Sequence, residues 1–131
     1  MLRESLDPAT TIVGLDVKVL AGVIYAETVA DRRLDADVRA LAARNSVAEA
    51  HLNEAARFAL DPDAAPPGVD PATRAALVLA RAASPSPAEV DASVVEACRE
   101  GRLSAPAIVE LVTWLAVLQM LHRLSSYLIA D

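Results

Sequence analysis

The 131-residue sequence contains a single cysteine, Cys98, and few aromatic residues, which make up 3% of the chain. One thiol excludes a disulfide within the chain and a metal site built from several cysteines. Because 54% of the residues are nevertheless hydrophobic, the core must consist mainly of alanine, valine and leucine. Alanine and leucine favour helices, and small alanine faces let helices approach closely. An apolar surplus in so small a domain often lies at a subunit interface.

Positive charge is also scarce, because 12 Lys and Arg residues oppose 18 Asp and Glu residues, which gives a net charge of -6. This balance argues against a nucleic-acid partner, whose phosphates require a basic face. The first five residues lack the apolar core of a signal peptide. The longest apolar run, Leu111–Leu121, includes Thr113 and Gln119 and is too short to cross a bilayer. We therefore expect a soluble, cytoplasmic protein without a membrane partner.

The hydrophobic pattern predicts an all-α protein, because apolar residues recur at helical spacing and no stretch alternates as a strand does. A chain of this length fits one domain, residues 1–131, with about five to six helices. We expect helices from about residue 7, over about 35–60, over 71–83, from about 89 to Gly101, and from 105 to about 129. The residues from Asp61 to Gly68, rich in proline, form the one obvious loop.

Helix punctuation is clearest in the second half of the chain. Asp70 precedes a proline and is expected to cap one helix, while Ser86 and Glu89 have the spacing of a capping box for the next. Gly101 is expected to end that helix in the left-handed conformation. The last helix is apolar nearly all round from Leu111 to Leu121, which predicts a central, buried helix. Glu110 lies early in it, where the helix dipole favours a carboxylate.

This ordered punctuation resembles the alkylhydroperoxidase D-like proteins, also called the carboxymuconolactone decarboxylase superfamily. The similar segments are Asp70–Leu77 with the following Ser84-Pro85, the helix Glu89–Arg99, the turn 100–104 and the stretch Ile108–Leu124. The final stretch looks most like the peroxidase-related branch, and the likeness covers about half of the chain. It implies the alkylhydroperoxidase D-like helical fold and a homo-oligomer, a trimer or hexamer, as in other members.

The redox motif of that family is missing. Its members carry Cys-x-x-Cys-x-x-x-His on a helix, and if His51 matches the family histidine, the two cysteine positions fall on Arg44 and Val47. The upstream glutamate of the family would fall near Arg32. Since the chain has one thiol, a dithiol cycle of peroxide reduction is impossible within one subunit. We accordingly expect no cofactor and no metal.

His51 is the leading catalytic candidate. Val47, His51, Glu54 and Phe58 share one helical face, so the imidazole can line a pocket with a carboxylate one turn away. Such a pair serves as general base and orienting partner, because histidine titrates near neutral pH. The alternative is a surface histidine beside a solvated glutamate.

His122, Gln119, Tyr25 and Phe58 are candidate substrate-binding residues. Gln119 and His122 lie one turn apart in the apolar last helix, where polar groups without partners would be unfavourable, so a polar cavity is one interpretation. The alternative is that the helix reaches the surface there. Cys98 shares a face with valines and is expected to act as a small hydrophobe.

Three functions remain open from the sequence. The first is a cofactor-independent lyase or isomerase that decarboxylates, isomerises or cyclises an apolar organic acid or polyketide-like substrate, with His51 as base or acid and Glu54 as its partner. The second is a non-catalytic member that binds a ligand or serves in an assembly. The third is a residual peroxidase that uses Cys98 alone.

Overall fold

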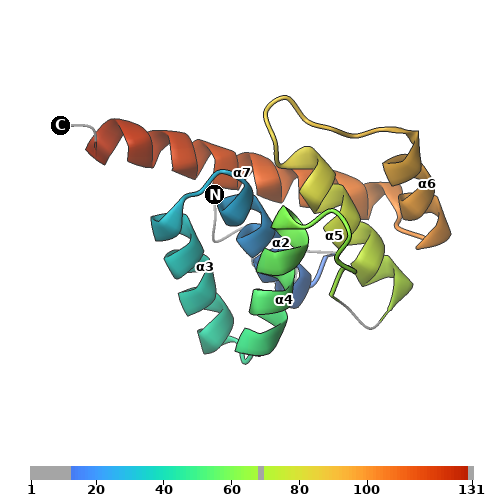
Figure 1. Cartoon of the computed structure of the whole chain (residues 1–131), viewed down its shortest axis with the longest axis horizontal. Coiled ribbons are helices and arrows are strands. Elements are labelled where there is room, and N and C mark those ends of the chain that lie inside the picture. The colour runs from blue at the N-terminus through green and yellow to red at the C-terminus, as the bar shows by residue number, and fades with distance from the viewer. Residues whose placement is uncertain (1–12, 68–69, 130–131) are drawn as a thin grey trace.

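A computed structural model describes residues 13–67 and 70–129. All regular structure in these two segments is helical, which confirms the all-α class, and no strand occurs there (Figure 1). The expected helix start near residue 7 lies outside the described residues. The helices within them are α2 (Leu15–Thr28), α3 (Arg32–Arg44), α4 (Glu49–Leu60), α5 (Pro71–Ala83), α6 (Ala92–Glu100) and α7 (Ala105–Ile129).

Helix α2 is the centre of the bundle. Every residue from Lys18 to Ala26 is buried, and the helix packs against α3, α4, α5 and α7. Small residues allow this crowding: a Cβ atom at Gly22 would lie 3.0 Å from a methyl carbon of Val38 on α3. A helix that is apolar on all sides belongs inside the bundle, and α2 meets that condition along most of its length.

Helix α7 is therefore not the central, buried helix that its composition predicted. Its inner face, with Leu111, Trp114 and Leu118, is buried, but Val109 is 65% exposed on the other side. Figure 1 shows α7 along one edge of the bundle, with its C-terminal part extending past α2 and α3. The helix is apolar, as its composition indicates, but other helices pack against one side of it only.

By length and composition alone, the Ala105–Ser125 part of α7 would suffice to cross a membrane, with a mean hydropathy of 1.5. The apolar run Leu111–Leu121 is thus the middle of a longer apolar helix. Core helices of soluble proteins meet the same criterion, and 33% of this stretch is buried in the bundle.

The predicted helix over 35–60 is two helices. Helix α3 begins at Arg32, because the Asp31 side chain caps it by accepting the Leu34 N–H at 2.9 Å. The chain then breaks at Ser46, whose φ of 60° is left-handed, and the Val47 N–H donates to the Ala42 carbonyl at 3.0 Å. This is the Schellman geometry that usually carries glycine. The break lets α3 and α4 each turn an apolar face to α2.

The start of α5 was predicted correctly and the start of α6 was not. Asp70 accepts the Thr73 N–H at 2.8 Å and caps α5. The Ser86–Glu89 capping box does not form, since α6 begins at Ala92 and Asp91 caps it. Glu89 instead donates its N–H to the Ala82 carbonyl at 2.7 Å. Residues 84–91 form a loop between α5 and α6, and Val90 is 46% exposed in it rather than stacked on Val94.

Gly101 does not take the left-handed conformation that the sequence predicted. Its φ is -75°, and the left-handed residue is Arg102, with a φ of 56°. Glycine is required at 101 for space: a Cβ there would lie 2.6 Å from the Ala75 Cβ and 2.7 Å from the Pro71 carbonyl oxygen. The turn after α6 therefore presses directly on the first turns of α5.

A buried ion pair joins the start of α2 to α7. Lys18, the one lysine in the sequence, is 1% exposed, and its Nζ lies 3.3 Å from Oε1 of Glu110. Glu110 also accepts the Val13 N–H. The Trp114 indole donates to the Lys18 carbonyl at 2.8 Å. Glu110 thus has a defined structural partner, beyond the favourable helix dipole expected from its position.

The aspartate caps of α5 and α6 predict a loss of stability in acid. Hydrogen bonds from the Thr73 N–H and hydroxyl lower the pKa of Asp70, and hydrogen bonds from the Ser93 hydroxyl and the Val94 N–H lower that of Asp91, both from an ordinary 3.8. A lowered folded-state pKa stabilises the fold above the ordinary value, and this contribution disappears as the pH falls through the lowered pKa values.

We therefore expect urea denaturation below pH 3.8 to show a steeper fall in the free energy of unfolding for the natural protein than for the Asp70→Asn/Asp91→Asn variant. Asparagine retains a capping oxygen but does not titrate in this range. Asp37→Asn, at an exposed site on α3, is the control. Identical slopes for the double variant and the natural protein would contradict the assignment.

Candidate functional site

Three ionisable side chains from three parts of the chain meet beside the end of α2. The Nδ1 atom of His122, on α7, lies 2.7 Å from Oδ2 of Asp31, at the turn between α2 and α3. The ring of Tyr25, on α2, meets the His122 ring edge to face, with centroids 6.4 Å apart and planes at 78°. Asp31 and His122 are 91 residues apart in sequence, so only the packing of α7 across this turn brings them together.

The α2–α3 turn positions the Asp31 carboxylate. Helix α2 ends with Ala30 in the left-handed conformation, φ 56°, and the Asp31 N–H donates to the Ala26 carbonyl at 2.9 Å. Asp31 is therefore both the last residue of the Schellman turn that ends α2 and the N-cap residue of α3. Its Oδ1 accepts the Leu34 N–H, which leaves Oδ2 directed at His122. The carboxylate is therefore held on two sides.

The surroundings keep Asp31 ionised. Burial alone would raise its pKa, but hydrogen bonds from the Leu34 N–H and from His122, with the charge of His122, lower the pKa overall. An ionised carboxylate can only accept hydrogen bonds, so Nδ1 of His122 carries a proton toward it. In the neutral ring the lone pair then resides on Nε2. This is the arrangement in which a carboxylate selects the tautomer of a general base.

Tyr25 is held in its neutral form beside this pair. Burial raises its pKa, Arg123 opposes that shift, and Asp31 adds to it. A neutral phenol is a hydrogen-bond donor and a proton source. The side chain is 4% exposed, whereas that of His122 is 30% exposed. The imidazole is consequently the most exposed member of the cluster.

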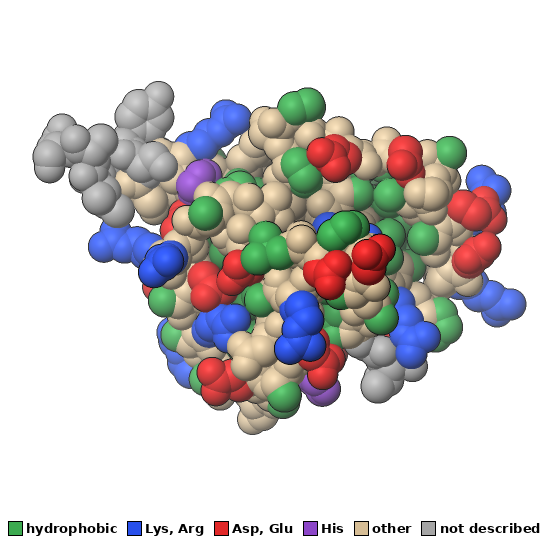
Figure 2. Space-filling view, viewed as in Figure 1, with side chains coloured by type: hydrophobic (Ala, Val, Ile, Leu, Met, Phe, Trp, Pro, Cys, Tyr) green, Lys and Arg blue, Asp and Glu red, His purple; other side chains and the backbone are tan. Residues whose placement is uncertain are grey.

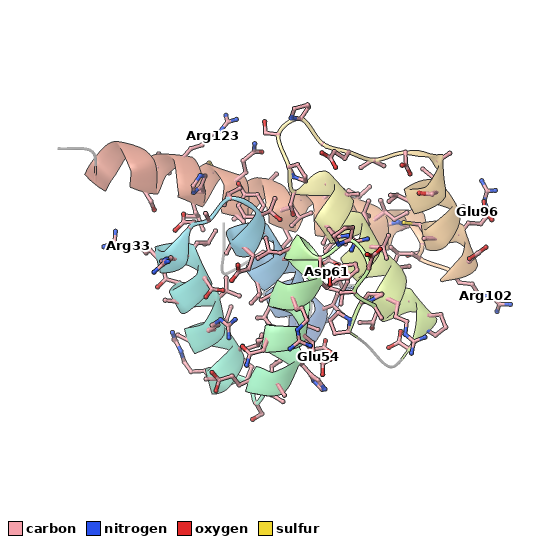
Figure 3. The ribbon with its side chains drawn as sticks, in the orientation of Figure 1. Arg33, Glu54, Asp61, Glu96, Arg102 and Arg123 are labelled. Atoms are coloured by element: carbon pink, nitrogen blue, oxygen red, sulfur yellow. The ribbon has the colours of Figure 1, made fainter. Side chains whose placement is uncertain are left out.

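Two arginines border the cluster. The charge of Arg123, next to His122 on α7, acts on Tyr25, and the Arg33 N–H contributes a hydrogen bond to Asp31. Both side chains are exposed; Figure 3 labels Arg123 above α7 and Arg33 beside α3, below that helix. Arg123 therefore brings positive charge close to the cluster in a protein whose net charge is -6.

His51 and Glu54 lie elsewhere. Both are exposed on α4, and Figure 3 labels Glu54 far from Arg123, the neighbour of His122. Figure 2 likewise shows the two histidine patches well apart on the surface. The fold thus brings together two of the predicted residues, His122 and Tyr25, but keeps the His51–Glu54 pair separate from them.

The remaining predicted residues are Phe58 and Gln119. Phe58 is 1% exposed, and the Arg81 guanidinium lies over its ring at 3.9 Å. Arg81 also donates to the Phe58 carbonyl at 3.3 Å, which satisfies a carbonyl in the last turn of α4. Phe58 is thus part of the core. Gln119 is half-buried on α7, one turn before His122.

Cys98 is buried, and burial raises its pKa. A raised pKa keeps the thiol protonated and weakly nucleophilic at neutral pH, the opposite of what a peroxidatic cysteine requires. Among the described residues, no group of three or more His, Cys, Asp and Glu side chains lies together in the way that a metal site requires.

Three hollows indent the described surface. The first has a volume of about 260 Å³ and lies between the starts of α2, α5 and α7. The second, of about 380 Å³, lies between the end of α4 and the 84–91 loop, beside Arg81. The third, of about 390 Å³, is an apolar groove between α6 and α7. None of these three is lined by Asp31, Tyr25 or His122. The cluster itself is part-buried, with 30% of the His122 side chain and 11% of the Asp31 side chain exposed.

Comparison with known protein families, with curated proteins and with solved structures found no match to this chain. The functional argument therefore depends on the geometry of the site. Asp31 is the member of the cluster that sequence reasoning missed. An aspartate can cap a helix, so Asp31 was a possible helix start. The residue before it is Ala30 rather than the glycine that usually marks a helix end, so the sequence did not indicate that α2 ends there.

Proposed function

We propose that the protein is a cofactor-independent enzyme that transfers protons on an apolar organic acid, with His122 as the base. The observation that supports this most directly is the 2.7 Å contact between Nδ1 of His122 and the ionised carboxylate of Asp31. A histidine oriented in this way is suited to general base catalysis, which contributes about 10²–10⁴-fold to a rate.

Each neighbour has a role in this proposal. Nε2 of His122 removes a proton from a carbon next to a carbonyl or carboxyl group of the substrate. Asp31 holds the ring and stabilises the imidazolium that results. Tyr25 supplies a hydrogen bond to the oxygen on which negative charge develops. Arg123 attracts the carboxylate of the substrate. The His122 imidazolium then gives its proton to a second carbon of the delocalised carbanion, which completes an isomerisation and restores the neutral base.

Membership of the carboxymuconolactone decarboxylase superfamily, without the redox cysteines, is part of this proposal. It is supported by the sequence resemblance of residues 70–124, of whose predicted caps the structure retains Asp70 at the start of α5. The helical arrangement is compatible with it. The chain breaks at Ser46, however, between Arg44 and His51, which would both lie on one helix if they matched the family's Cys-x-x-Cys-x-x-x-His motif. The pair His51–Glu54 becomes the secondary candidate for catalysis, since both side chains are solvated.

A non-catalytic role is the alternative, and one observation favours it: the 2.7 Å contact between His122 and Asp31 joins α7 to the α2–α3 turn. Asp31 and His122 would then serve to fasten α7 to the α2–α3 turn. The protein would act through its surfaces, as a ligand-binding or assembly partner.

The tautomer of His122 tests the geometry without a substrate. We expect the ¹⁵N spectrum of the neutral ring to show a protonated Nδ1, because Asp31 accepts that hydrogen. Asp31→Ala should shift the population toward the Nε2–H form, which predominates in solution, whereas Glu54→Ala should leave the His122 signals unchanged. A natural protein with protonated Nε2 would contradict the proposed base.

Proton transfer itself is tested by exchange. The protein is incubated in D₂O with a panel of apolar 2-oxo, 3-oxo and unsaturated acids, and deuterium incorporation is followed by NMR. We expect incorporation to fall about 10²-fold or more in His122→Gln, and His51→Gln is the matched control. Loss of exchange in the His51 variant with full activity in the His122 variant would reject His122 as base. Absence of catalysed exchange across the panel would favour the non-catalytic role.

A further inference from the structure

The outer face of α7 is an apolar stripe that the bundle leaves uncovered. Its large exposed side chains are Val109, Val112, Met120 and Leu124, with exposures between 39% and 65%. Ala116, also exposed, lies at the middle of the stripe. Between residues 105 and 122 the one charged side chain is Glu110, which contacts Lys18 in the interior. The stripe therefore presents no charge to solvent until Arg123.

The stripe has the spacing of a helix-pairing seam. Residues 109, 112, 116, 120 and 123 recur at intervals of three and four, which keeps them on one side of an α-helix. They are also arranged symmetrically: Val112 and Met120 each lie four residues from Ala116, and Val109 and Arg123 each lie seven residues from it. A small residue at the centre allows two helix backbones to approach closely.

We propose that the partner on this stripe is a second copy of the chain, whose α7 packs antiparallel to the first with the two Ala116 residues at the two-fold axis. This register opposes Val112 to Met120 of the partner subunit, and it opposes Thr113 to Gln119 of the partner subunit. Apolar side chains thus meet apolar ones, and polar side chains meet polar ones. The inference does not depend on whether the Asp31–His122 pair is catalytic.

Charge selects the antiparallel orientation. In a parallel pair each residue faces its own copy, so the two Arg123 side chains would lie against each other. In the antiparallel pair each Arg123 lies beside Val109 of the partner subunit, where its aliphatic stem can pack and its guanidinium can reach water. The two arginines are then about 14 residues of helix apart, about 21 Å, where salt screens their repulsion.

The apolar groove between α6 and α7 extends the contact. It is lined by Val90, Val95, Cys98 and Ile108, among others, and is about 390 Å³ in volume. The antiparallel register places Leu124 of the partner subunit opposite Ile108, at the edge of this groove. The two-fold axis repeats the contact at the other end of the pair. Exposed Val90 and Val95 thereby gain an apolar neighbour.

The area is adequate for a dimer that dissociates on dilution. Residues 105–124 span about 30 Å of helix, and with the groove the face is about 20 Å wide, so each copy would cover roughly 600 Å². Stable interfaces cover about 800 Å² per partner. We therefore expect a dissociation constant in the micromolar range.

A membrane is the competing occupant of an apolar helix face, and the charge pattern disfavours it. Helices that lie on membranes carry lysine and arginine along their polar side and attract anionic lipids. Here α7 contributes Arg123 alone, and the chain has a net charge of -6. An anionic surface would repel such a protein, whereas an uncharged stripe meets no such barrier on a second copy.

The test is the molar mass of the full chain by sedimentation equilibrium between about 1 and 100 µM. The natural protein is expected to approach twice the 13.8 kDa of one chain. Ala116→Glu should raise the dissociation constant at least 10-fold, because it buries two carboxylates at the two-fold axis. Ala43→Glu makes the same change at an exposed site on α3 and should leave dimerisation unchanged. Circular dichroism checks folding, and Val112→Lys replaces Ala116→Glu if the latter does not fold.

Cysteine cross-linking tests the register. Under mild oxidation Ala116→Cys should form a covalent dimer, and Val109→Cys alone should not. An equal mixture of the Val109→Cys and Arg123→Cys variants should cross-link, and the natural protein, with Cys98 buried, is the baseline. Self-linking of Val109→Cys would show a parallel pair and overturn the proposed register.

Three other results would overturn the second copy as occupant. They are a monomer at every concentration, a trimer or hexamer unaffected by Ala116→Glu, and flotation of the natural protein with vesicles of phosphatidylcholine, alone or mixed with anionic phosphatidylserine, that Ala116→Glu abolishes. The last result would assign the stripe to a membrane.

Discussion

Replacement of Glu110 by alanine is expected to lower the free energy of unfolding by about 3–5 kcal/mol, because it removes a carboxylate that lies against a buried cation. The Lys18 side chain is 1% exposed and its Nζ lies 3.3 Å from Glu110. The Val13 N–H and the first turn of α2 lose their contact with Glu110 as well. Urea denaturation followed by circular dichroism measures the change.

Two controls separate the buried charge from a general effect of truncation. Glu96→Ala removes the exposed glutamate paired with Arg99 at 3.1 Å, and exposed pairs contribute about 0–1 kcal/mol. The double variant Lys18→Met/Glu110→Met replaces both charges by apolar groups and should recover most of the stability lost in Glu110→Ala. If the double variant is less stable than the single one, the penalty does not come from an unpaired charge.

Substitution of Gly101 by alanine is expected to destabilise the protein by about 1–3 kcal/mol, although alanine is normally the better residue at a helix end with negative φ. The added methyl group would lie 2.6 Å from the Ala75 Cβ and 2.7 Å from the Pro71 carbonyl oxygen. Neither atom can rotate away, because one is a Cβ and the other belongs to the backbone. Helix α5 must therefore shift away from the α6–α7 turn.

Gly14→Ala is the matched control for this prediction. A Cβ at Gly14 would approach the Asp16 carboxylate oxygen at 2.5 Å, but that atom ends a flexible, exposed side chain that can rotate. Thermal unfolding should therefore show a clear loss for Gly101→Ala and little change for Gly14→Ala. Equal effects of the two substitutions would refute the packing explanation for Gly101.

The Asp31–His122 pair and the apolar stripe meet at the same end of α7. His122 fastens this helix to the α2–α3 turn, and Arg123 follows it on the exposed side. In the proposed dimer Val109 of the partner subunit lies beside Arg123, so a second copy would form an apolar wall next to His122. Dilution of the protein below its dissociation constant would then lower any activity of the site.

The candidate site was only partly predictable from the sequence. His122 was recognisable because polar residues in apolar helices require partners, and Tyr25 was named only as a candidate substrate-binding residue. Asp31 was not recognisable, since its role arises from a left-handed Ala30 that directs the carboxylate toward a helix 91 residues away. The same limitation concealed the break between α3 and α4, where Ser46 takes the left-handed conformation in place of a glycine.

The sequence by itself determined that this chain is helical, where α5 begins and where α7 begins and ends, because these features follow from local hydrophobic period and capping chemistry. The tertiary structure alone decided which helix is central, which residue pairs with His122, and why residue 101 is glycine. Hydrophobic period and capping residues depend only on residues within a few helical turns of each other in the sequence. Burial, ion pairing and close backbone approach depend on which distant segments pack together, and α2 became the centre because it has apolar partners on every side.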